Sequence, residues 1–187
     1  LGPLDRSAAR DLAQKPMAVL QLEYDAPETL ELLLDETGCR ANLLAIACSG
    51  LIETLEGDRR ILTLAHVKQV LHSYSRLQDE LRYWRHYNPL NRAIIRTVLL
   101  ARNATRRTVR DDLIRAGITA SAEQVSASLD HLELGYVLLR RESGQLHCPI
   151  PVLRRAIEQE QDLNAGLADD AAAYRENSSA PRIGLWR

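Results

Sequence analysis

The stretch SAEQVSASLDHLELGYVLLRRESGQLHC, residues 121–148, decides the fold class of the second half of the chain. Ser121 and Gln124 have the spacing of a capping box, so a helix should begin there. The apolar residues that follow this helix, interrupted by Ser143-Gly144, predict a β-hairpin over residues 136–148. A helix that leads directly into a hairpin is typical of a winged helix-turn-helix.

Two more helices are predicted ahead of this one. Apolar residues recur at helical spacing over residues 90–99, and residues 103–105 break that helix. A second apolar set at 108–114 indicates another helix, which Gly117 closes. Three helices followed by a hairpin give the order of a winged helix, and a last helix after Pro151 is expected to join the same domain.

Residues 1–76 are predicted to form a small bundle of four short helices. Pro16 lacks a backbone donor, so the first helix should end near Gln14. Pro27 suits the first turn of the second helix, and Gly38 suits its C-terminal cap. Apolar spacing then predicts a third and a fourth helix before the bundle ends.

The predicted fold class is therefore mainly α, with a small helical bundle followed by a winged helix-turn-helix that has one β-hairpin. The expected boundaries are 1–76 for the helical domain, 77–88 for a junction, 89–161 for the winged helix and 162–187 for a tail. The tail has too little apolar content to fold unaided, so we expect it to be flexible or to clamp a partner.

Composition and charge limit the classes of function. The 187 residues carry a formal net charge of −1, which gives no global attraction to nucleic acid or to an acidic membrane surface. Cys39, Cys48 and Cys148 are an odd number of cysteines, which favours a reducing cytoplasm over a disulfide framework. No apolar run reaches the roughly 20 residues of a membrane span. The sequence opens at Leu1 in a helical pattern, so we expect a piece of a larger protein.

Motifs of catalysis are missing from the sequence. It contains no G-x-x-x-x-G-K-[ST] loop, no G-x-G-x-x-G loop and no G-x-S-x-G elbow. Cys39 and Cys48 are nine positions apart, and His66 and His72 are six apart, so neither pair has the spacing of metal ligands on one helix face. The sequence therefore predicts no catalytic residue, no metal site and no enzyme activity for this segment.

A local basic run makes nucleic-acid binding an alternative. The basic run comprises seven arginines around the predicted recognition helix, and the hairpin adds two more. The run consists of Arg92, Arg96, Arg102, Arg106, Arg107, Arg110 and Arg115. The candidate phosphate contacts are Arg106, Arg107, Arg110, Arg140 and Arg141. The would-be recognition helix, however, carries Glu123, Asp130 and Glu133 and no Lys or Arg, and phosphates repel such a helix. Docking of a protein partner or self-association is favoured, and a DNA-binding transcription or replication factor is the alternative.

Two segments together resemble a known family. One is LGPLDRSAARDLAQKPM, residues 1–17, and the other is ETGCRANLLAIAC, residues 36–48. The second is similar to the lid motif T-G-G-x-P-x-L-[IL]-x-x-x-C, with Cys39 in place of the second glycine and Ala41 in place of the proline. Followed by a winged helix, they resemble the C-terminal lid and winged-helix region of bacterial STAND-type and origin-recognition-like AAA+ ATPases. The resemblance covers residues 1–160.

The resemblance implies a division of labour. A missing upstream core would bind and hydrolyse ATP with Mg²⁺, the lid-like bundle would close over the nucleotide, and the winged helix would pass the nucleotide state to partners. Lid residues at the positions of Gly38 and Arg40 approach the nucleotide in relatives, and Arg40 can offer a positive charge to a phosphate. The junction at Trp84 would transmit the movement. The implied partners are the chain's own upstream ATPase core and a protein docked at the winged helix.

Overall fold

The computed structural model describes residues 2–55, 57 and 59–179. Within these residues the structure is mainly helical and contains a small antiparallel hairpin, which confirms the predicted fold class. Contacts divide the chain into two compact units. The first unit comprises the residues up to Trp84 together with Pro149–Gln159, and the second comprises Arg85–Cys148 with the residues from Glu160 on.

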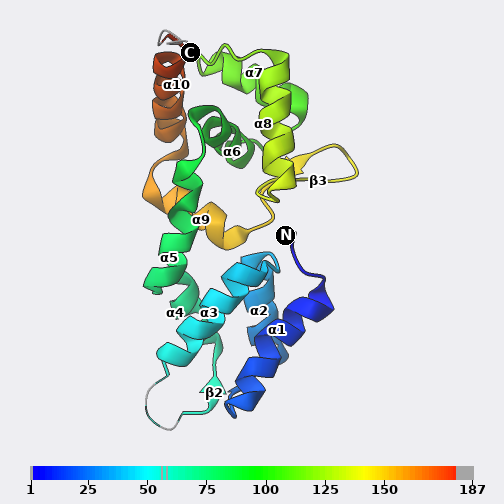
Figure 1. Ribbon diagram of the computed structural model, residues 1–187, viewed down its shortest axis with the longest axis vertical. Helices are drawn as coiled ribbons and strands as arrows, with labels where there is room; N and C mark the ends of the chain where they lie inside the picture. Colours follow the sequence, from blue (N-terminus) through cyan, green and yellow to red (C-terminus); the bar gives the residue numbers. More distant parts are fainter. Residues whose placement is uncertain (1, 56, 58, 180–187) are drawn as a thin grey trace, which may run out of the picture. The chain divides into compact units, whose positions relative to one another are not determined.

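The first unit is a bundle of helices with two short strands, which pair in parallel (Figure 1). Its described elements are α1 (Arg6–Val19), β1 (Glu23–Tyr24), α2 (Pro27–Thr37), α3 (Ala41–Glu53), β2 (Ile61–Leu62), α4 (Leu64–Ser73), α5 (Ser75–Leu81), the start of the 3-10 helix η1 (Arg82–His86) and α9 (Pro151–Glu160). The core between them is aliphatic, and its fully buried side chains include Leu33, Leu34, Leu44, Leu51 and Leu77.

The first helix is longer than the sequence predicted. It runs through Pro16 to Val19, so the expected end near Gln14 was wrong. Ala9, Ala13 and Met17 form a buried stripe on α1, while Pro16 lies on the exposed side. Burial of this stripe continues the helix although the proline removes one backbone hydrogen bond.

The turn between α2 and α3 requires a glycine. Gly38 ends α2 in the left-handed conformation with a φ of 59°, as predicted for a C-terminal cap. A Cβ at this position would lie 2.7 Å from the carbonyl oxygen of Pro149 and 3.3 Å from the side chain of Ile150. Both the backbone angle and this close approach exclude a larger residue. The segment that leads into α9 therefore packs directly on the α2 cap.

The helix α9 belongs to the first unit, which differs from its expected place in a winged helix over residues 89–161. Its buried residues are Val152, Leu153 and Ile157. Arg155 reaches across to α2, where its Nη1 lies 2.7 Å from the carboxylate of Glu36. Helical spacing shows that a helix has a buried face but not which neighbour covers it, which is why the sequence assigned α9 to the other unit.

The second unit has three helices and a hairpin in the predicted order, followed by a further helix (Figure 1). Its elements after η1 are α6 (Pro89–Leu100), α7 (Arg106–Arg115), α8 (Ala122–Leu134), β3 (Leu139–Arg140), β4 (Leu146–His147) and α10 (Leu163–Ser179). Ser121 and Gln124 form the predicted capping box at the start of α8. Between α6 and α7, Ala104 forms an antiparallel bridge to Leu146 of the hairpin.

The segment from residue 163 to 179 is an ordered helix rather than the flexible or partner-clamping tail expected for residues 162–187. In Figure 1, α10 runs beside α6, and the two helices are in extensive contact. Its docking face buries Gly166, Asp170 and Ala171. The sequence missed this helix because its face is small and polar rather than apolar. Residues 180–187, the rest of that tail, lie outside the described residues.

We expect Gly38→Ala to lower the free energy of unfolding of the first unit by about 2–3 kcal/mol. The left-handed backbone disfavours alanine by about 1 kcal/mol, and the new methyl group meets a backbone oxygen that cannot easily move. The matched control is Gly57→Ala, since Gly57 has a φ of 62° but no atom within 4 Å of an added Cβ. Urea unfolding followed by circular dichroism compares the two, and equal losses would show that the contact with Pro149 is unimportant.

Candidate interaction site

The basic run of the second unit is partly neutralised by α8. Arg106 of α7 donates from Nη1 to the Ser126 hydroxyl at 3.0 Å and forms an ion pair with Asp130. Its Nη2 also lies 3.5 Å from Glu133, which pairs with Arg140 of β3 at 2.6 Å. Two of the five predicted phosphate contacts are therefore engaged by the acidic residues of the helix beside them.

The other three predicted phosphate contacts are exposed. Arg107 and Arg110 lie on α7 and Arg141 lies in the hairpin turn, and none of them forms an ion pair with a described residue. Burial, and then the charge of Arg141, lower the pKa of His147 on β4. This imidazole is therefore neutral at pH 7 and adds no positive charge to the hairpin.

The polar atoms of α8 are largely engaged within the unit. The Gln124 side chain accepts the amide hydrogen of Ser121 at 2.8 Å, and the Ser121 hydroxyl accepts that of Gln124. Asp130 and Glu133 serve as ion-pair partners, which leaves Glu123 as an exposed charge near the start of the helix. In a DNA groove this carboxylate would face phosphates, so the surface of α8 is poorly suited to reading DNA.

A cleft of about 620 Å³ lies along α8 within the second unit. Its lining comes from the start of α6, the turn before α8, α8 itself and the end of α10. The residues are Asn88, Pro89, Leu90, Thr119, Gln124, Ala127, Ser128, Tyr174, Asn177 and Ser178. None of these side chains is charged, and most carry an amide or a hydroxyl. Such a lining can hydrogen-bond a neutral polar group such as a peptide backbone, and it offers no cation to a phosphate.

A buried ion-pair cluster holds α10 against α6. The carboxylate of Asp170 is only 5% exposed and lies 2.7 Å from Nε of Arg92 and 3.1 Å from Nε of Arg96. Arg96 is itself buried, and a Cβ added at Gly166 would overlap its guanidinium group. The absence of a side chain at Gly166 therefore makes room for the arginine that Asp170 binds.

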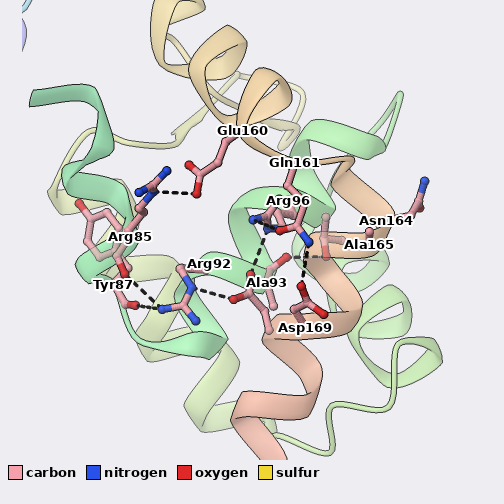
Figure 2. Close-up of polar contacts among 12 residues, drawn as sticks. Arg85, Tyr87, Arg92, Ala93, Arg96, Glu160, Gln161, Asn164, Ala165 and Asp169 are labelled. Atoms are coloured by element: carbon pink, nitrogen blue, oxygen red, sulfur yellow. Dashed lines mark hydrogen bonds and ion pairs between the residues drawn. The ribbon is translucent and has the colours of Figure 1, made fainter. Parts of the chain in front are cut away.

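The cluster extends into the segment that enters α10 (Figure 2). Arg85 pairs with Glu160 at 2.6 Å, and Gln161 donates to Asp169 at 2.7 Å. Arg92 also donates to the carbonyl oxygens that precede α6, at 2.8 and 3.2 Å. These bonds join the entry to α10 with the start of α6, so they position one wall of the cleft along α8.

Sequence patterns did not predict this cluster. Arg92 and Arg96 were assigned to the basic run, although their spacing of four residues places both on one helix face. Their partner Asp170 lies 78 and 74 positions further along the chain. No local pattern connects residues so distant in sequence, and the surrounding segment was expected to be a tail.

The predicted nucleotide-proximal residues flank the turn between α2 and α3. Gly38 contacts the segment before α9, as described above. Arg40 is the N-cap of α3, where its carbonyl accepts the amide hydrogen of Leu44 at 2.9 Å, and its side chain is partly exposed. Trp84 is 3% exposed at the end of the first unit. The roles of these residues toward nucleotide and in movement between units stay predictions.

Neither a metal centre nor a membrane span is found among residues 2–55, 57 and 59–179. No group of three or more His, Cys, Asp or Glu side chains there could hold a metal ion, and no helix there combines the length and apolarity needed to cross a bilayer.

Burial raises the pKa of the Cys48 thiol to about 11. This cysteine is therefore protonated at neutral pH and a poor nucleophile.

Comparison with solved structures shows what the fold is similar to. It matches the Walker-type ATPase PABY2304 of Pyrococcus abyssi with a TM-score of 0.57 and 16% sequence identity. The match covers 83% of this chain and 42% of that chain, so this chain spans less than half of the ATPase's length. No protein-family model and no curated protein matches the sequence. The chain therefore shares its fold with part of an ATPase.

Asp170→Asn should destabilise the second unit by about 3–5 kcal/mol, because it removes the negative charge that compensates two arginines, one of them buried. The matched control is Asp169→Asn, whose exposed side chain can still accept a hydrogen bond from Gln161, so its loss should stay below about 1 kcal/mol. Urea unfolding measures both. Hydrogen exchange should show faster exchange along α10 in the first variant alone, and similar behaviour of the two variants would contradict the assignment of Asp170 as the anchor.

Proposed function

We propose that this chain is a non-catalytic regulatory and interaction module of a nucleotide-dependent ATPase of the AAA+ or STAND-like kind. The observation that carries the proposal is the likeness of its fold, over 83% of its length, to part of a Walker-type ATPase. The lid-like motif at residues 36–48 supports the same proposal from the sequence. In this proposal a core upstream of the chain binds ATP and Mg²⁺, and the whole protein acts in the cytoplasm.

The first unit would serve as the lid of that core. The turn of Gly38 and Arg40 would face the nucleotide, and a lid can respond to nucleotide only where its contacts differ between the open and closed states. Arg40, at the start of α3, would contribute a positive charge toward a phosphate. Trp84, at the end of the unit, would transmit the closing movement of the lid to the winged helix.

The second unit would act as a winged helix that docks a protein. Three helices, the hairpin and the bridge of Ala104 to Leu146 support the winged-helix assignment. The uncharged cleft along α8, together with the ion pairs that occupy Arg106 and Arg140, favours a protein partner over DNA. Self-association through the same surface is included in this proposal.

A nucleotide-dependent change in this chain is the test of the proposed function. In the polypeptide that includes the upstream core, ADP and a non-hydrolysable ATP analogue should give different amide-exchange protection at the α2–α3 turn and along α8. Arg40→Gln should reduce that difference, whereas Arg59→Gln, an exposed change in the same unit, should not. The chain alone should not hydrolyse ATP. Identical exchange in the two nucleotide states, or turnover by the chain alone, would contradict the proposal.

DNA binding by the second unit is tested separately. Fluorescence anisotropy with duplex DNA should show no binding at about 50 mM salt, where phosphate contacts are strongest. If Arg107 and Arg110 did contact phosphates, binding would appear and fall steeply with salt. The double variant Arg107→Gln/Arg110→Gln would then reduce the slope of log K against log salt by about 2. That pair of results would favour the DNA-binding alternative.

A further inference from the structure

The first unit contains a cavity that plays no part in the function proposed above. It measures about 560 Å³ and lies among α2, α4 and α9. Its apolar part is formed by Leu32 and the buried Leu71. Its polar part is formed by Glu36 of α2, Lys68 and His72 of α4, and Arg155 of α9. Basic groups from two helices, far apart in sequence, therefore face one hollow.

The cavity carries an excess of positive charge. Its carboxylate, Glu36, is already bound to Arg155 with 2.7 Å between Oε2 and Nη1. Lys68 and His72 are four residues apart, which places them on the same face of α4. Neither forms a hydrogen bond or an ion pair through its side chain with a described residue. The positive charges of Lys68 and Arg155 thus face the single carboxylate of Glu36, and the imidazole of His72 adds a third basic group.

The sequence around α4 supports this reading independently of the geometry. Residues 59–78 contain no Asp or Glu, although the whole chain has 25 acidic residues. The acids that follow are engaged elsewhere, since Asp79 pairs with Arg82 and Glu80 accepts a hydrogen bond from Asn42. The helix that supplies Lys68 therefore brings no acid of its own to neutralise the cavity.

We propose that this cavity binds a phosphate-bearing small molecule. Lys68, His72 and Arg155 would contact the phosphate, and Leu32 and Leu71 would contact the organic part. Lysine and arginine are the usual protein ligands of phosphate, and the volume is within the range of small-molecule sites. The bound phosphate would share Arg155 with Glu36 and so join α4 to α9. The proposal does not depend on the proposed function.

Titration of the full chain with inorganic phosphate and with butyl phosphate tests the proposal. Amide chemical shifts in α4 and α9 should change and saturate with both probes, and butyl phosphate should bind more tightly because its alkyl chain contacts the leucines. Lys68→Gln should weaken binding about tenfold. The matched control Lys15→Gln removes the same charge from α1, where Lys15 pairs with Asp11, and should leave the affinity unchanged.

Several results would overturn the proposal. Shifts that grow linearly without saturation, or that spread over the whole chain, would indicate unspecific ionic effects. Acetate binding as tightly as phosphate at equal ionic strength would exclude selectivity for phosphate. Because changing Arg155 could disturb the pairing of Glu36, the decisive variant is Lys68→Gln/His72→Gln, which alters residues that bind no other side chain. If this double variant folds by circular dichroism and binds phosphate as before, the site is refuted.

Discussion

The second unit depends on one buried carboxylate. An ionised Asp170 is stable in the interior because two arginines of α6 surround it, and buried Arg96 in turn needs that negative charge. The docking face of α10 otherwise offers small residues such as Gly166 and Ala171, so apolar burial adds little to its attachment. The end of α10 lines the cleft along α8, so the two ion pairs that hold α10 against α6 also position one wall of that cleft.

Part of the charge in the second unit serves cohesion, because acidic residues of α8 engage two of the five candidate arginines. Arg106 and Arg140 join α7, α8 and the hairpin through the acidic residues of α8. A basic run in a sequence therefore differs from a basic surface in a structure, because the acids that neutralise it can come from the next helix. What remains along α8 is an uncharged cleft, and this feature directs the functional proposal toward proteins.

Local signals were the part of this fold that the sequence could predict. The capping box of Ser121 and Gln124 and the glycine cap at Gly38 act over three or four residues, and both were found correctly. The end of α1 was predicted too early. The effect of proline on a helix is a local signal, whereas the burial of Met17 that continues the helix depends on tertiary packing. The neighbour of α9 and the docking of α10 depend on pairs such as Arg155 with Glu36, which only tertiary structure brings together.

The difference between local signals and tertiary contacts also explains which features of the candidate sites the sequence could predict. Counting arginines identified Arg106 and Arg140 but could not show that Asp130 and Glu133 engage them.

The discontinuous first unit has a consequence for synthesis of the protein. While a ribosome makes residues 85–148, α2 and α4 have already been synthesised and α9 has not, so Gly38 and Glu36 lack their partners in α9 and the segment before it. Of the two units, the first begins to be synthesised earlier. Its last helix, α9, is nevertheless made only after the hairpin of the second unit.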